Sequence, residues 1–188
     1  MILRIINEIN IALDNNCPIL ALTSALTLPD ICGKAEFPEL SVSQRYKQWV
    51  GKYVVQPKDY YDRETGWGIP FLSGELLYAL RCSMLHQGDP DLIDEDKQKQ
   101  NIDYFELLWQ EPERSCKTSF CQKSEIIKID GKEKCIHNNY CIGIRGLCKR
   151  LCVVARRYYN KNKKRFDFLN DNTIVNIDFR TRQMFHLQ

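Results

Sequence analysis

The first half of the chain repeats its apolar residues at helical rather than strand spacing, and this pattern narrows the possible folds most strongly. Ile2, Ile5, Ile6, Ile9 and Leu13 fall on one face of an expected first helix. Three more helices are expected where such spacing returns between helix-stopping residues. They cover Pro18 to Gly33, Ser43 to Val55, and a segment from Ser73, a suitable N-cap, to Gly88.

The second half combines strands with one long helix. Apolar and polar residues alternate from Ser124 to Asp130, which predicts a strand, and Asp130-Gly131 is typical of a hairpin turn. The other expected elements are strands over Tyr104–Trp109, Tyr140–Arg145 and Thr173–Phe179, and a helix over Gly146–Asn160.

We therefore expect an α+β fold. A mainly helical N-terminal bundle (1–88) would be joined by an acidic loop to an α+β part (102–188), which holds a small antiparallel sheet and a long helix. A chain of 188 residues fits a single domain, 1–188, and its 44% hydrophobic residues are enough to build a core.

The sequence predicts neither a membrane span nor an export signal. Its long apolar stretch, Cys17 to Pro29, is too short to cross a bilayer, and Glu8 and Asp14 precede it where a signal peptide would be basic. We expect a soluble, cytoplasmic protein with no membrane partner. Its nine cysteines would then be thiols in a reducing compartment.

Many of these cysteines gather in the second half, near His137. They are Cys116, Cys121, Cys135, Cys141, Cys148 and Cys152. Such a set could hold zinc, but no second tightly spaced pair follows Cys116 and Cys121, and Cys148 and Cys152 lie one helical turn apart, as core residues do. The prediction is core packing, with no metal and no cofactor.

The segment Arg81-Cys-Ser-Met-Leu-His86, near the end of the fourth expected helix, contains the best candidates for catalytic residues. Arginine holds phosphate oxygens with a bidentate fork, and histidine transfers protons near neutral pH. Together they could cleave RNA without a metal, with His86 moving a proton from the 2′-hydroxyl and Arg81 holding the phosphate. On an ideal α-helix, residues five apart differ by roughly 140°, so the side chains would need the long arginine stem or a frayed helix end to meet.

This segment resembles the motif of the HEPN superfamily, an arginine followed by four to six residues and a histidine. The resemblance implies a helical, homodimeric, metal-independent endoribonuclease, often found in toxin–antitoxin or phage-defence systems, with Arg81 and His86 as the site. Here Cys82 stands where members commonly have asparagine or another polar residue, and Gln87 separates His86 from Gly88. The strings 27–36 and 72–86 also resemble an uncharacterised bacterial protein family.

Residues 145–165 contain nine basic residues and no acidic one. Arg150, Arg157 and Lys164 recur every seven residues and would form an exposed stripe. Lys149, Arg150, Arg156 and Arg157 are the candidate RNA-binding residues, although a stripe of this kind can also be an ordinary solvated face.

Two functions remain open on the sequence. The first is a HEPN-like RNA-binding or RNA-cleaving protein, and the second is a non-catalytic interaction or regulatory protein of bacterial or phage origin, such as an antitoxin partner. In the second, the Arg81–His86 segment would be structural, and the loop around Trp67 or the basic helix would contact the partner. Arg81 would then form an ion pair, and His86 would cap the helix C-terminus.

Overall fold

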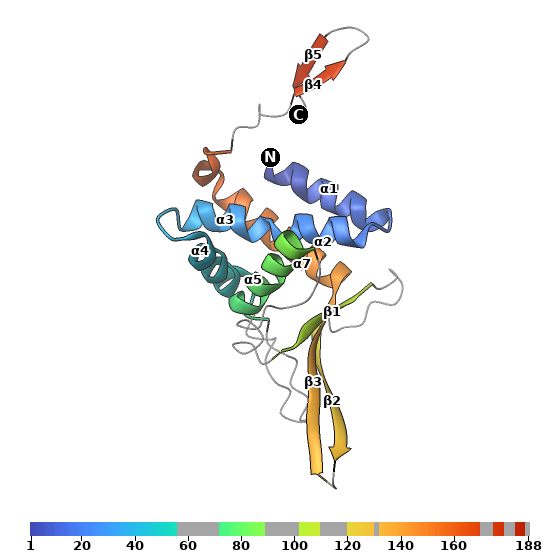
Figure 1. The fold of residues 1–188 in the computed structure, drawn as a ribbon. Helices are drawn as coiled ribbons and strands as arrows, with labels where there is room; N and C mark the ends of the chain where they lie inside the picture. The colour runs from blue at the N-terminus through green and yellow to red at the C-terminus, as the bar shows by residue number, and fades with distance from the viewer. Residues whose placement is uncertain are drawn as a thin grey trace.

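The computed structural model describes residues 1–55, 72–88, 102–109, 120–129, 132–169, 175–178 and 183–186 (Figure 1). It confirms the α+β class: a body of helices carries a three-stranded sheet at one end, and a separate two-stranded hairpin follows. The expected acidic loop and the loop around Trp67 lie outside the described residues. Within the described part of the chain, no helix is both long and apolar enough to cross a membrane.

The first expected helix is confirmed as α1 (Ile2–Asp14). The single helix expected over 18–33 is wrong, because α2 (Pro18–Leu26) and α3 (Leu28–Glu36) replace it. Pro29 has no N–H to donate to Ala25, which a continuous helix would require. The Thr27 hydroxyl instead donates to the Ser24 carbonyl oxygen over 2.7 Å at the break.

The third and fourth expected helices both exist, and both end in a π-helical turn. Helix α4 (Val42–Trp49) starts with a capping box between Ser41 and Gln44 and continues into η1 (Val50–Val54). Helix α5 (Gly74–Cys82) starts at the predicted N-cap Ser73 and continues into η3 (Ser83–Gln87). Gly88 ends it with a left-handed φ of 79°, as the sequence predicted.

The sheet is mixed, which corrects the expectation of a purely antiparallel one. Strands β2 (Phe120–Ile129) and β3 (Lys132–Gly143) form the predicted antiparallel hairpin, and β1 (Tyr104–Leu108) pairs with β3 in parallel. Since β1 and β3 are separated by a whole strand, the chain has room for the crossover that parallel pairing needs. The strand expected over 173–179 is confirmed as β4 (Val175–Asp178), paired with an unpredicted β5 (Gln183–His186).

The long C-terminal helix organises the core. Helix α7 (Ile144–Lys161) follows β3 directly, packs against α1, α2 and α3, and leads into the short η5 (Lys163–Phe166). Buried residues from both halves, including Trp49, Leu77, Tyr140 and Leu151, belong to one hydrophobic cluster. Cys148 and Cys152 lie inside it, as the core-packing interpretation predicted.

Candidate catalytic site at the end of helix α5

Two glycines bring three helices close enough to build one site. A Cβ on Gly33 of α3 would lie 2.9 Å from the Arg45 carbonyl oxygen, and a Cβ on Gly74 of α5 would lie 2.4 Å from that of Lys47. Helix α4 therefore packs against α3 on one side and α5 on the other through backbone contacts that only glycine permits. This packing places residues of α3 beside the end of α5.

Arg81 and His86 meet directly: Nη1 of the guanidinium lies 2.8 Å from Nε2 of the imidazole. An ideal α-helix would separate them, but the final turn is π-helical, with the Gly88 N–H donating to the Ser83 carbonyl oxygen. Residues five apart lie nearly above one another where hydrogen bonds run from i+5 to i. The expected angular gap is thus closed by the backbone rather than by fraying.

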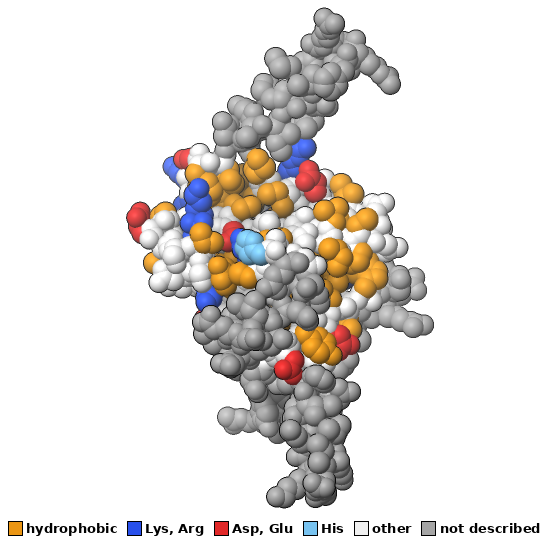
Figure 2. Space-filling model, in the orientation of Figure 1, with side chains coloured by type: hydrophobic (Ala, Val, Ile, Leu, Met, Phe, Trp, Pro, Cys, Tyr) orange, Lys and Arg blue, Asp and Glu red, His pale blue; other side chains and the backbone are white. Residues whose placement is uncertain are grey.

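Asp30 completes a chain of three groups. Its Oδ2 accepts a hydrogen bond from Arg81 Nε over 3.1 Å, across 51 positions of sequence. The side chains of Asp30 and Arg81 are 19% and 16% exposed, whereas His86 is open to solvent. A histidine is visible on the face shown in Figure 2, bordered by acidic and apolar side chains. Burial raises the pKa of Asp30, although the Arg81 guanidinium opposes that shift.

Aromatic rings form the wall behind Arg81. The guanidinium lies 5.9 Å from the Tyr78 ring centre, and Tyr78 meets Tyr46 edge to face at 5.3 Å. Burial raises the pKa of Tyr46 well above its ordinary value. Both the Tyr46 hydroxyl and Asp30 Oδ1 are buried without a hydrogen-bond partner. The Tyr78 ring thus lies beside the guanidinium, and Nη1 of Arg81 contacts His86.

The contact assigns a hydrogen-bonding role to each group. Arginine has donors only, so His86 Nε2 is the acceptor in this contact, which puts the ring proton on Nδ1. Asp30 orients the guanidinium through Nε and leaves its outer nitrogens for His86 or an anion. A phosphate binding those nitrogens would release Nε2 to take a proton. The arrangement therefore offers an oriented cation beside a proton acceptor.

Asp30 is the residue that sequence reasoning missed. An acidic residue in the first turn of a helix is usually explained by the helix dipole, and Asp30 sits in that position of α3. Its partner Arg81 is remote in sequence, so no residue spacing indicated that the two side chains meet.

Three of the four predicted RNA-binding residues come together on α7. Lys149, Arg156 and Arg157 line a groove of about 320 Å³ with Asn10, Cys152 and Val153. Arg150 is half-buried and donates from Nε to the Val54 carbonyl oxygen over 3.2 Å. The predicted stripe through Arg150 and Lys164 is wrong, because Arg150 turns towards η1 and the helix ends at Lys161.

Four of the cysteines described by the structure, Cys32, Cys141, Cys148 and Cys152, are buried thiols, whereas Cys17 is exposed and Cys82 is half-buried. Burial raises the pKa of Cys32 and Cys148, and raises that of Cys152 to about 11. Within the described residues, no three His, Cys, Asp or Glu side chains are grouped to hold a metal. Cys116 and the side chains of Cys121, Cys135 and His137 lie outside the described part of the structure.

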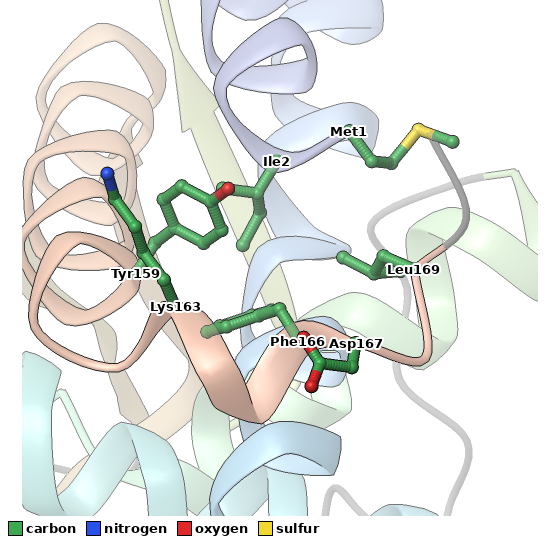
Figure 3. Close-up of a pocket in the computed structure, with 7 residues that line it drawn as sticks. All are labelled: Met1, Ile2, Tyr159, Lys163, Phe166, Asp167 and Leu169. Carbon is green, nitrogen blue, oxygen red and sulfur yellow. The ribbon is translucent and has the colours of Figure 1, made fainter. Parts of the chain in front are cut away.

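A second hollow, of about 450 Å³, lies where the N-terminus meets the end of α7 (Figure 3). Its polar groups include Lys163 and Asp167, and its apolar wall includes Ile2, Tyr159 and Phe166. The groove on α7 and this hollow are both separate from Arg81 and His86, which are the residues that combine a cation with an imidazole. No protein-family model, curated protein or solved structure matches the chain.

Proposed function

We propose that the chain is a HEPN-like, metal-independent endoribonuclease whose active groups are Arg81 and His86. The observation that carries this proposal is the 2.8 Å contact between the guanidinium and an exposed imidazole, with Asp30 orienting the guanidinium from behind. The resemblance of the segment to the HEPN motif supports the same function. Members of that superfamily commonly act as dimers in toxin–antitoxin or phage-defence systems, and we extend the proposal to both properties.

In the proposed reaction, a phosphodiester displaces the imidazole from Arg81 and binds the outer guanidinium nitrogens. His86 Nε2 then accepts the proton of the ribose 2′-hydroxyl, whose oxygen attacks the adjacent phosphorus. The 5′-oxygen leaves and takes up a proton from water, and His86 returns its proton to the solvent, so the products are a 2′,3′-cyclic phosphate and a free 5′-hydroxyl. Arg81 stabilises the additional negative charge on the phosphorane oxygens. Asp30 acts as a positioning residue for Arg81.

The test is cleavage of transfer and messenger RNA under single-turnover conditions, with and without a chelator. The parent should cleave in both and leave cyclic-phosphate ends. His86→Ala should lower the rate about a hundred- to ten-thousandfold, since that is the usual contribution of a positioned acid or base. Arg81→Lys should be similarly severe, because an ammonium cannot reproduce the fork. The control is Arg4→Lys, because Arg4 forms an ordinary surface pair with Glu8.

A non-catalytic interaction protein is the second candidate. It is favoured by large apolar side chains exposed near the junction of α1 and α2: Ile11 (52%), Ile19 (53%) and Leu20 (60%). In this function the ion pair between Arg81 and Asp30 would simply hold α5 on α3. A parent protein that cleaves no RNA under any metal condition, together with Arg81 and His86 variants that melt at much lower temperature, would establish this candidate instead.

A further inference from the structure

An open pocket of about 510 Å³ lies at the other end of α3 from Asp30. It is lined by Lys34, Ala35, Glu36, Pro38, Arg165 and Phe168. Lys34 follows Asp30 by four residues, so both lie on one face of the helix and about 6 Å apart along its axis. The pocket thus begins about one helical turn from the residue that holds Arg81.

Phe168 gives this pocket an aromatic surface. The side chain is 40% exposed, although phenylalanine is usually buried. Its ring stacks on the buried Phe166 at 6.1 Å with an interplanar angle of 25°, so the core holds it in place. From α3, the ammonium of the exposed Lys34 lies over the ring, 4.5 Å from its centre. A flat ligand could displace that flexible side chain and stack on the ring.

Glu36 holds two cations in place, Arg165 of the pocket and Lys52. One carboxylate oxygen accepts from Lys52 Nζ over 2.6 Å and from the Tyr53 hydroxyl over 2.8 Å. The other accepts from the Tyr158 hydroxyl over 2.8 Å and from Arg165 Nη1. Lys52 and Arg165 nevertheless stay about half exposed. Lys34 and Arg165 line the pocket with this single carboxylate, which also pairs with Lys52, so the cations outnumber the carboxylate and an added anion would be attracted.

A stacking surface between fixed cations suits one class of ligand. Single-stranded nucleic acids bind through bases stacked on aromatic rings and phosphates attracted to basic side chains. We propose that this pocket binds one nucleotide of a single-stranded RNA substrate, with its base on Phe168 and an adjacent phosphate between Lys34 and Arg165. The strand would run along α3, with the cleaved bond at Arg81 and His86 a few nucleotides away. This assignment rests on the proposed ribonuclease function.

Binding can be measured by fluorescence anisotropy with the full chain and a labelled twelve-nucleotide oligouridine carrying 2′-O-methyl groups, which cannot be cleaved. Phe168→Ala should raise Kd about tenfold, within the range for loss of one stacked base. Phe168→Trp should keep the parent Kd, because it keeps a flat ring. Val42→Ala is the matched control, since it also shortens an exposed apolar side chain, and it should change nothing.

An oligomer with the same phosphates but no bases separates stacking from charge. The parent and Phe168→Ala should bind it equally, whereas Lys34→Gln should weaken it. If Phe168→Ala binds oligouridine as tightly as the parent does, the pocket assignment is overturned even where cleavage by Arg81 and His86 is established. If the parent cleaves no RNA but the Phe168 effect and the abasic result are both found, the pocket stands as an RNA site and the ribonuclease proposal fails alone.

Discussion

Gly74 lies so close to Lys47 that a Cβ at position 74 would come within 2.4 Å of the Lys47 carbonyl oxygen. Backbone rather than a flexible side chain is in the way, so a larger residue must push α5 from α4. We predict that Gly74→Ala lowers the free energy of unfolding by about 2 to 3 kcal/mol, at the upper end of ordinary overpacking. Urea denaturation measures this directly.

Gly51 provides the matched control for that substitution. A Cβ there would meet nothing within 4 Å, and the residue lies in the helical segment η1. Gly51→Ala should be neutral or stabilise the fold by up to about 1 kcal/mol, because alanine has the higher helix propensity. Equal destabilisation by both substitutions would contradict the close packing of α4 and α5.

Glu36 should make stability depend on pH in the acid range. Burial opposes its charge, but hydrogen bonds from Lys52, Tyr158 and Tyr53 prevail and lower the pKa of Glu36 to about 2. A carboxylate with a lowered pKa stabilises the fold above its unfolded pKa and loses that effect as pH falls towards the folded pKa. The stability advantage of the parent over Glu36→Gln should shrink by on the order of 2 kcal/mol between about pH 5 and pH 2.

Glu8→Gln is the corresponding control on the surface. Glu8 pairs with Arg4, and its side chain is 59% exposed, so solvent screens the pair. The difference between the parent and Glu8→Gln should stay within about 0.5 kcal/mol over the same pH range. If the difference in stability between the parent and Glu36→Gln is equally independent of pH, the four hydrogen bonds to Glu36 do not favour the charged carboxylate.

Asp30 should give the opposite pH trend. Burial raises its pKa while Arg81, Arg45 and His86 act to lower it. A raised carboxyl pKa means that protonation favours the folded state, so the parent gains stability relative to Asp30→Asn as pH falls through the folded pKa. If the parent instead loses stability relative to Asp30→Asn as pH falls, the ion pair with Arg81 outweighs the cost of burying Asp30.

Asp30→Asn also distinguishes a role of Asp30 in positioning Arg81 from a role in binding the RNA substrate. Asp30→Asn keeps an acceptor for Arg81 Nε but removes the charge that fixes the guanidinium. We predict that kcat falls about ten- to a hundredfold, as expected for a displaced catalytic group, with KM and the melting temperature little changed. Steady-state cleavage assays with RNA in excess measure the first two quantities. A change in KM alone would place Asp30 in substrate binding.

The sequence predicted what depends on local pattern. Apolar spacing located the helices, Ser73 and Gly88 marked the two ends of the fourth helical segment, and Asp130-Gly131 marked the hairpin. The break at Thr27 was also available locally, because Pro29 is a known helix breaker, but the apolar run concealed it. The π-helical turn after Cys82 could not be predicted, because residues 83–87 include no residue type that marks such a turn in a sequence. Nor could the pairing of Asp30 with Arg81, which depends on how α3, α4 and α5 pack.

The basic groove on α7 gives a final prediction, in the salt dependence of RNA binding. Lys149, Arg156 and Arg157 face one groove, whereas Arg150 is occupied by the Val54 carbonyl oxygen. If the groove binds phosphates, replacing its three cations by Gln should reduce the slope of log Kd against log salt by about 2, the value for losing three single-strand phosphate contacts. Arg150→Gln should leave that slope unchanged. Equal slopes for all these variants would make the groove an ordinary solvated face, and RNA binding would then rest on Arg81, His86 and the pocket at Phe168.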